Sequence, residues 1–380
     1  MKLDRTNTGI TGRWWWTVDR YCLLALLLLI ATGAVLVTAA SPPVAARLGY
    51  DEFYFVRQQA FFLVLGLLVM LGMSLLDAKS IRRVAVLGFL GTLALLALLP
   101  LIGSENKGAV RWVFIGGVSL QPSELIKPFF AVTVAWVFAE GRRMQGFPAY
   151  RIALALYAVL ALLLIIQPDF GMVVTVSVMF AAQIFLAGLP FLWIAVMALV
   201  GAGGVIGAYY ALPHVTKRID SFLNPELSDN YQVSKSLEAF ASGGLLGRGP
   251  GEGVVKWRIP DSHTDFIFAV SGEEFGALLT LLIVVLYGFI LLRGFMRIWR
   301  ESDLFVLLAA AGILVQFGIQ AVINMGVAVH LLPAKGMTLP FLSYGGSSMM
   351  GIALGMGMVL GLTRRRYGEL THVSRRYQVA

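Results

Sequence analysis

The side chains best suited to chemistry stand in a short polar run, Ile259 to Phe266, just before a long apolar stretch. A carboxylate at the outer end of a membrane helix, such as Asp265, is partly desolvated, which makes it a better general base. The positive end of the helix dipole stabilises the anion and opposes this effect. Asp265 is therefore a candidate general base, while capping of the following helix explains its position equally well. Ser262, His263 and Asp265 are too close in sequence to assume a hydrolytic triad, and no Gly-x-Ser-x-Gly sequence occurs.

Four further ionisable residues fall at membrane depth, where such groups are costly and often functional. Glu124 and Lys127 are three residues apart, on one face of a predicted helix, and can neutralise each other. Glu273 and Glu274 lie about two turns beyond Asp265, with Glu273 nearer its face. A buried structural pair, for example Lys127 with one of these glutamates, is the alternative. We favour it for Lys127 and Glu274 and leave both interpretations open for Glu273.

Two other segments bring cations to the same side as Asp265. One contains Arg111 and Trp112; the other, Pro333 to Ser348, contains Lys335 and Ser343. Cations there suit a phosphate-bearing ligand. Contact with lipid headgroups and, for Trp112, the aromatic belt of the membrane interface are the alternatives. The Gly and Pro content of the second segment predicts a broken or re-entrant stretch that lines a cavity.

The elements that must position these groups are membrane helices. Hydrophobic residues make up 58% of the chain and charged residues 13%, against about 45–50% and about 25% in soluble domains. The apolar runs of about 17–25 residues match a hydrocarbon core of roughly 30 Å. We expect an all-α integral membrane bundle of about ten transmembrane helices, at roughly 21–39, 55–76, 83–102, 122–139, 151–167, 171–187, 190–211, 266–292, 304–325 and 345–363.

The first apolar run is long enough to span and lacks a clean cleavage site, so we expect no cleavable signal peptide. The single cysteine, Cys22, excludes a disulfide framework and a cysteine metal site. Basic residues cluster before the first span and in alternate connectors, which predicts cytoplasmic termini and explains the net charge of +9 without nucleic acid. The chain then divides into a cytoplasmic segment 1–20, a transmembrane domain 21–363 and a cytoplasmic tail 364–380.

The long connector between spans seven and eight, 212–265, falls outside the cell in this topology. Loops of this length are usually functional or disordered. Within it, Tyr231 to Ala241 has the spacing of a short amphipathic helix suited to a membrane surface. The glycine-rich turn that follows, Gly243 to Gly251, contains Arg248 and is not a Walker loop. A flexible turn and an anion contact are equally good interpretations of it.

Several of these motifs together resemble one family. Arg111-Trp112, Gln121-Pro122-Ser123-Glu124 with Lys127, Gln167 to Gly171, His263 to Ala269 with Glu273-Glu274, and Pro333 to Ser348 occur in the order found in the SEDS proteins (shape, elongation, division and sporulation). The resemblance covers nearly the whole chain. Lys335-Gly336 followed by Thr338 to Phe341 is closer to the division members of the family than to the elongation members. His330 stands where a small residue, often glycine, is expected.

The resemblance implies a peptidoglycan glycosyltransferase of the inner membrane that polymerises lipid II at the division septum with a class B penicillin-binding protein and other division proteins. The family's catalytic aspartate maps onto Asp265. Our candidates for diphosphate contact are Arg111, Arg248, Lys256 and Lys335, unless a divalent cation, Mg or Mn, assists. Trp112, His263 and Ser343 are further candidates for substrate contact, and no metal ligand is assigned. A lipid II flippase and a non-catalytic division scaffold are the alternative functions.

Overall fold

The computed structural model describes residues 9–106, 109–115, 118–211, 213–223, 231–333 and 336–364. All ten predicted spans coincide with helices, so the all-α membrane fold is confirmed. Seven of these helices are long and apolar enough to cross a membrane: α2 (Arg20–Leu48), α3 (Tyr54–Leu75), α4 (Ala78–Ile102), α5 (Pro122–Arg143), α6 (Ala149–Ile166), α11 (Ile267–Ile298) and α12 (Leu304–Ala328). The other three have shorter apolar stretches: 170–186 in α7 (Phe170–Leu186), 195–210 in α8 (Phe191–Ala211) and 346–362 in α13 (Gly346–Leu362).

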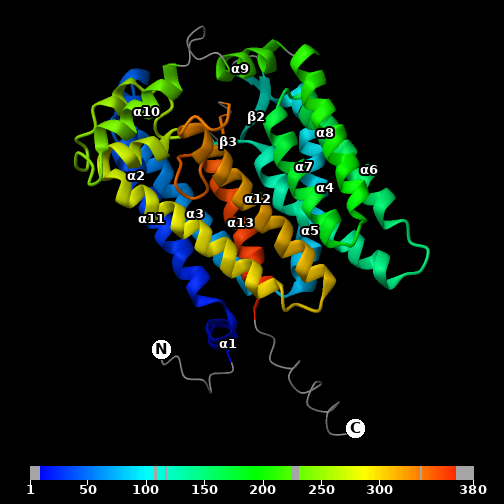
Figure 1. Ribbon diagram of the computed structural model, residues 1–380. Helices are drawn as coiled ribbons and strands as arrows, with labels where there is room; N and C mark the ends of the chain where they lie inside the picture. Colours follow the sequence, from blue (N-terminus) through cyan, green and yellow to red (C-terminus); the bar gives the residue numbers. More distant parts are fainter. Residues whose placement is uncertain are drawn as a thin grey trace.

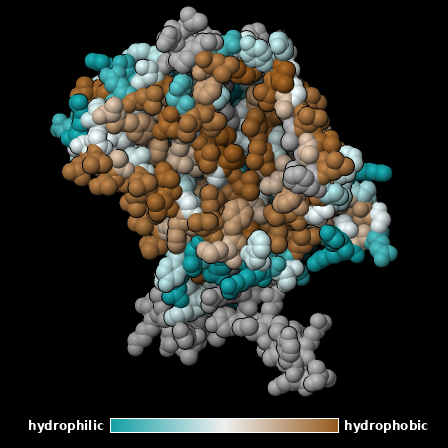
Figure 2. Space-filling model, in the orientation of Figure 1, coloured by the Kyte–Doolittle hydropathy of each residue, from teal (hydrophilic) through white to brown (hydrophobic). Residues whose placement is uncertain are grey.

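The core of the bundle is built from α5, α12 and α13. The most apolar stretch of α5 is 83% buried, whereas that of α6 is 22% buried, so α5 is interior and α6 faces lipid. Figure 1 shows α12 and α13 in the middle, with α2 and α11 on one flank and α6 and α8 on the other. Figure 2 shows a broad hydrophobic band across this face, bordered by hydrophilic residues at both ends. Such a band is what a lipid bilayer requires.

A small antiparallel sheet connects α4 to α5 at the end of the bundle opposite to the start of α2 and the end of α13 (Figure 1). The topology predicted from the sequence places this end outside the cell, and it is called the outer end. Helices α9 (Pro213–Leu223) and α10 (Tyr231–Gly243) also lie there. Its strands are β1 (Ser104–Asn106), β2 (Ala109–Ile115) and β3 (Val118–Leu120), in that order, with Ser104 opposite Trp112 and Val113 opposite Leu120. This sheet was not predicted from the sequence. It places Arg111 and Trp112 on a rigid strand rather than on a free loop.

The described residues of the long outer connector form the α-helices α9 (Pro213–Leu223) and α10 (Tyr231–Gly243) and the 3-10 turn η1 (Val255–Arg258). The amphipathic helix predicted from Tyr231 is confirmed as α10, whereas α9 was not predicted. Val233 and Ala239 of α10 are buried, and Phe240 packs edge-on against Phe268 of α11 at 5.6 Å. The loop helix therefore covers the outer end of α11.

Helix α11 is interrupted at Gly276, which has φ 76° and ψ −175°. The glycine-rich turn lies across this break, and its backbone replaces the missing helical bonds. Ala277 N donates to Gly244 O at 2.9 Å, and Gly249 N donates to Glu274 O at 2.9 Å. A Cβ on Gly247 would lie 2.2 Å from Glu274 O, so this approach requires glycine. The glycine-rich turn thus holds the two parts of the broken helix together through its backbone.

The described residues between α12 and α13, 329–333 and 336–345, enter the bundle without helical structure. Phe341 is fully buried, and its carbonyl oxygen would lie 2.2 Å from a Cβ on Gly33 of α2. Tyr287 of α11 donates its hydroxyl to Pro340 O. The predicted broken, buried stretch is confirmed here. His330 has a φ of 59° at the entrance to this stretch, which gives a physical reason why glycine is expected at that position.

Candidate active site

A cavity of about 950 Å³ opens at the outer end of the bundle. Its walls come from six parts of the chain that are far apart in sequence. The lining residues lie within 48–62, 111–114, 119–124, 168–172, 261–265 and 336–348. Aromatic residues of the α2–α3 turn and the start of α3 form one wall, and the start of α13 forms another. The cavity thus combines apolar and polar surfaces, as a ligand that is half lipid and half sugar would require.

Asp265 lines this cavity at the end of the long connector. The N-cap residue of α11 is Phe266, so Asp265 stands one position before the cap. Gly336 passes close by, because a Cβ built on it would lie 3.4 Å from Asp265 Oδ2. The structure therefore brings the candidate base and the segment after α12 to the same point.

Arg111 and Trp112 also line the cavity, on β2. Arg111 donates from Nε to Gln167 O at 3.1 Å and from a terminal nitrogen to Pro168 O at 2.5 Å. Its guanidinium lies 3.9 Å from Asp169 Oδ1. These contacts fix the guanidinium on the turn before α7, where Arg111 lines the cavity. Lys335, the other cation expected here, lies outside the described residues.

Glu124 lines the inner part of the cavity and forms an ion pair with Lys127 at 2.7 Å. Lys127 is completely buried and also donates to Gln320 Oε1 at 3.1 Å. The amide nitrogen of Gln320 then donates to Thr338 Oγ1 and to Ser348 Oγ, both at 3.3 Å. The suggested pairing of Lys127 with a glutamate of α11 is wrong, because its partner is three residues away in α5. The Glu124–Lys127 pair is therefore connected through Gln320 to Thr338 and Ser348 in the cavity wall by a series of hydrogen bonds.

Lys256 lies outside the cavity, so its suggested contact with the diphosphate needs correction. Its ammonium is buried and donates to Ala39 O at 2.9 Å, to Gly251 O at 3.2 Å and to the carboxylate of Glu274. Glu273 accepts from the backbone N–H groups of Val254, Val255 and Lys256 at 2.7, 2.6 and 2.9 Å. Glu273 and Glu274 therefore hold the connector against α11 and are not among the described residues that line the cavity.

Arg248 is also not among the described cavity-lining residues, and its assignment to the diphosphate needs the same correction. Its side chain is exposed on the glycine-rich turn, where Nε donates to Ser242 O at 3.4 Å. The backbone N–H of Arg248 bonds to Glu273 O at 3.0 Å. Backbone bonds hold this turn against α11, a role that neither the flexible turn nor the anion contact predicted from the sequence describes.

His263 and Ser343 stand behind the cavity wall. His263 is buried between Phe55 and Tyr344, with ring centroids 4.7 and 5.0 Å away. Burial lowers the pKa of His263 to about 4, so the ring is neutral at neutral pH. Ser343 donates to Thr264 O at 2.5 Å and accepts from Leu339 N at 2.8 Å. Both residues support the wall, and neither is among the described residues that face the cavity.

Several polar residues of the cavity belong to the motifs that carry the family resemblance but were not predicted as site residues. Asp169 caps α7 by accepting from Met172 N at 3.4 Å, and it also accepts from Gln121 Nε2 at 3.5 Å. Thr338 and Ser348 share a hydrogen bond of 2.6 Å at the start of α13. A cluster of polar residues before an apolar run was the signal that could have found them. Within the described ranges, no three His, Cys, Asp or Glu side chains gather closely enough to hold a metal ion.

Comparison with known proteins identifies the family. A family model described as cell cycle protein, whose label joins FtsW, RodA and SpoVE, matches residues 19–368. The chain belongs to the FtsW/RodA/SpoVE family. The resemblance read from the motifs is confirmed.

The FtsW/RodA/SpoVE relatives cover nearly the full length of the chain. A protein named probable peptidoglycan glycosyltransferase FtsW from Caulobacter vibrioides is 43% identical over 96% of this chain and 94% of its own. The protein of that name from Coxiella burnetii is 36% identical over 91% and 96%.

Two solved structures of the FtsW/RodA/SpoVE type share the fold. One, described as a peptidoglycan synthase complex that coordinates polymerization and crosslinking, has a TM-score of 0.76 at 28% identity and covers 93% of this chain and 100% of that chain. The other, the rod shape determining protein RodA of Thermus thermophilus, has a TM-score of 0.69 at 28% identity and covers 93% and 99%.

Proposed function

We propose that the chain is a peptidoglycan glycosyltransferase that polymerises lipid II and uses Asp265 as its general base. The observation that carries this proposal is that Asp265 and Arg111, 154 residues apart in sequence, line one cavity at the outer end of the bundle. A lipid-linked sugar substrate must present its sugars there while its tail stays in the bilayer. The cavity provides both environments.

In the proposed reaction Asp265 takes the proton of the acceptor's GlcNAc 4-hydroxyl. The hydroxyl oxygen then forms a bond to the anomeric carbon of the donor's MurNAc, and the bond from that carbon to the diphosphate breaks. Undecaprenyl diphosphate leaves with the electron pair. His263 is not among the described residues that line the cavity, and burial lowers its pKa to about 4, so it is neither placed nor protonated to act as a general acid at neutral pH. The leaving diphosphate must therefore be stabilised as an anion.

Arg111 supplies a fixed positive charge for that anion. The first turn of α13 supports it, because Gly345, Ser347 and Ser348 line the cavity and a helix N-terminus favours negative charge. No step is assigned to a divalent cation. Mg²⁺ at a diphosphate is held by one or two carboxylates together with phosphate oxygens, so the lack of a larger ligand cluster among the described residues does not bear on its use.

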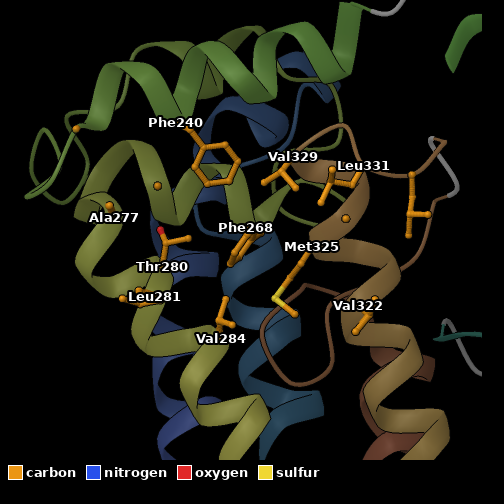
Figure 3. Close-up of a pocket in the computed structure, with 14 residues that line it drawn as sticks. Phe240, Phe268, Ala277, Thr280, Leu281, Val284, Val322, Met325, Val329 and Leu331 are labelled. Atoms are coloured by element: carbon orange, nitrogen blue, oxygen red, sulfur yellow. The ribbon is translucent and has the colours of Figure 1, made fainter. Parts of the chain in front are cut away.

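We further propose that the chain works in the inner membrane at the division septum, with both termini in the cytoplasm and a class B penicillin-binding protein as its partner. An almost wholly apolar groove of about 860 Å³ between α10, α11 and α12 suits the partner's membrane helix. Figure 3 shows Phe240 above the groove, with Phe268 and Val284 from α11 and Val322 and Met325 from α12 around it.

Filling this groove tests the proposed partner. Met325→Trp is expected to lower the amount of penicillin-binding protein that copurifies with the chain. Leu199→Trp, on the exposed and lipid-facing surface of α8, should leave copurification unchanged. Equal copurification with both variants would remove the groove as the docking site.

The decisive experiment for the base is polymerisation of labelled lipid II by the purified chain with its partner. Asp265→Asn should abolish glycan polymer while the protein stays folded. Asp220→Asn, which changes an outer carboxylate that bonds Tyr209 away from the cavity, should polymerise like the parent. Full activity of Asp265→Asn would exclude it as the base. Transfer of lipid II across vesicles by a parent that makes no polymer would favour a flippase, and neither activity would favour a scaffold.

A further inference from the structure

Three successive backbone carbonyls, the last of them that of Asp265, accept hydrogen bonds from residues that are distant in sequence. The carbonyl oxygens of His263, Thr264 and Asp265 accept hydrogen bonds from Tyr344 N at 2.8 Å, Ser343 Oγ at 2.5 Å and Asn324 Nδ2 at 2.8 Å. Two of these donors belong to the segment before α13, whereas Asn324 belongs to α12. The direction of the Asp265 side chain therefore depends on groups far away in sequence.

Asn324 differs from the other two donors because its amide bonds to two segments at once, the one that carries Asp265 and the one that contains Met337. Its second N–H donates to Met337 O at 2.5 Å. Met337 follows Gly336, the residue whose backbone lies beside Asp265 Oδ2. One buried amide thus sets the backbone of the candidate base and the backbone of the cavity wall next to it.

The buried, unpartnered oxygen of the Asn324 amide indicates that the N–H groups, and not the oxygen, are needed at this position. Asn324 is 2% exposed, and its Oδ1 has no hydrogen-bond partner among the described residues. A buried acceptor without a partner is unfavourable. The reverse orientation would place Oδ1 against two carbonyl oxygens, so both N–H donors are needed where they are.

We infer that Asn324 is a positioning residue for glycosyl transfer, which sets the geometry of Asp265 against the acceptor hydroxyl. The inference rests on the proposed role of Asp265 as base. A shift of about 1 Å in a reacting group can cost about 100-fold in rate. Loss of the two donors should therefore lower kcat more than it changes the KM for lipid II, because Asn324 does not itself line the cavity.

Two substitutions of Asn324 test this. Asn324→Asp keeps the shape but has no N–H and at most one O–H to donate, whereas Asn324→Ala has no side-chain donor at all. We expect kcat to fall about 10- to 100-fold, with KM within about 3-fold of the parent. Gln316→Leu is the matched control, because Gln316 is buried on the same helix two turns earlier and is not among the described cavity-lining residues. It should keep the parent kcat.

The melting temperature and lipid II binding of each variant separate positioning from folding. A folded Asn324 variant with the parent's kcat would overturn the inference. A fall in kcat that only matches the fall caused by Gln316→Leu would also overturn it, as would a loss of lipid II binding in proportion to the loss of rate. If Asn324→Asp fails to fold, Asn324→Ala decides. Asp265→Asn in the same assay keeps the two proposals apart: its full activity refutes the base, whereas its inactivity beside fully active Asn324 variants refutes only the positioning role.

Discussion

Lys256 and Glu274 form a buried ion pair that joins the outer connector to α11, two residues before the break at Gly276. Their side chains are 3% and 0% exposed. Lys256 is bonded at the same time to two backbone carbonyls, one of them Ala39 O on α2. The pair therefore ties three parts of the chain together on the outer side of the bundle.

Loss of one partner of this pair should destabilise the fold strongly. Lys256→Met leaves the Glu274 carboxylate buried without its cation, which typically costs about 3–5 kcal/mol. Unfolding of the purified protein in increasing denaturing detergent measures the effect. The double variant Lys256→Met with Glu274→Met should recover much of the loss. Lys235→Met, which breaks the more exposed pair with Glu238, should have little effect. Equal stability of the Lys256 and Lys235 variants would contradict a structural role for the buried pair.

Arg111 should not tolerate exchange for lysine, although the charge is kept. An ammonium cannot donate to Gln167 O and Pro168 O in the fixed directions of a guanidinium, so the turn before α7 would lose its support. We expect Arg111→Lys to lower polymerisation at limiting lipid II by about 10-fold or more. Initial rates at several lipid II concentrations provide the measurement. Parent-like kinetics would show that charge alone is sufficient.

Arg248 should be dispensable for catalysis. Its side chain is exposed, and the turn is held against α11 by backbone atoms. Arg248→Ala is therefore expected to keep the parent's dependence of rate on lipid II concentration. Gly247→Ala is the contrasting variant, because its Cβ would collide with Glu274 O, and it should destabilise the protein. A raised KM for lipid II in Arg248→Ala would instead indicate that this arginine contacts the substrate.

His263 should make the fold sensitive to acid. Its pKa is about 4 in the folded protein against 6.5 for an exposed histidine, because burial disfavours the cation. Between these values the unfolded chain binds a proton that the folded chain does not, so stability falls as the pH falls from 6.5 to 4. The full loss is about 3 kcal/mol, and above pH 7 the histidine contributes no pH dependence.

His263→Phe tests this pH dependence because it keeps a ring between Phe55 and Tyr344. Melting temperatures of the parent and the variant, measured from pH 8 to pH 4, should converge toward high pH and diverge in favour of the variant toward low pH. Curves that run parallel over the whole range would exclude His263 as the titrating group.

The membrane helices could be predicted from sequence because each depends on the length and composition of its own run. Asp265 could be found for a similar reason, since it stands where a polar segment meets an apolar one. Lys256 could not be placed, because its burial depends on the path of the connector, and nothing local marks Glu274 as its partner. Arg111 was found, but its contact with Gln167, 56 residues away, depends on how α7 packs beside the sheet.

Two elements, the sheet and helix α9, were not predicted from the sequence. The sheet of residues 104–120 has short strands separated by glycine, which read as a loop. Helix α9 has apolar residues at Val215, Ile219 and Phe222, a helical spacing that could have been found. Asn324 gave no signal at all, because an asparagine inside an apolar run indicates a hydrogen bond without indicating to what.

The break at Gly276 has a consequence for the order in which the protein is made. The turn that clasps it, residues 243–251, precedes α11 in the chain and leaves the ribosome first. When the broken part of α11 is synthesised, the backbone groups that complete it already exist earlier in the same chain. The carbonyl and N–H groups freed by the break at Gly276 therefore have partners close by in sequence, as backbone groups within a bilayer require.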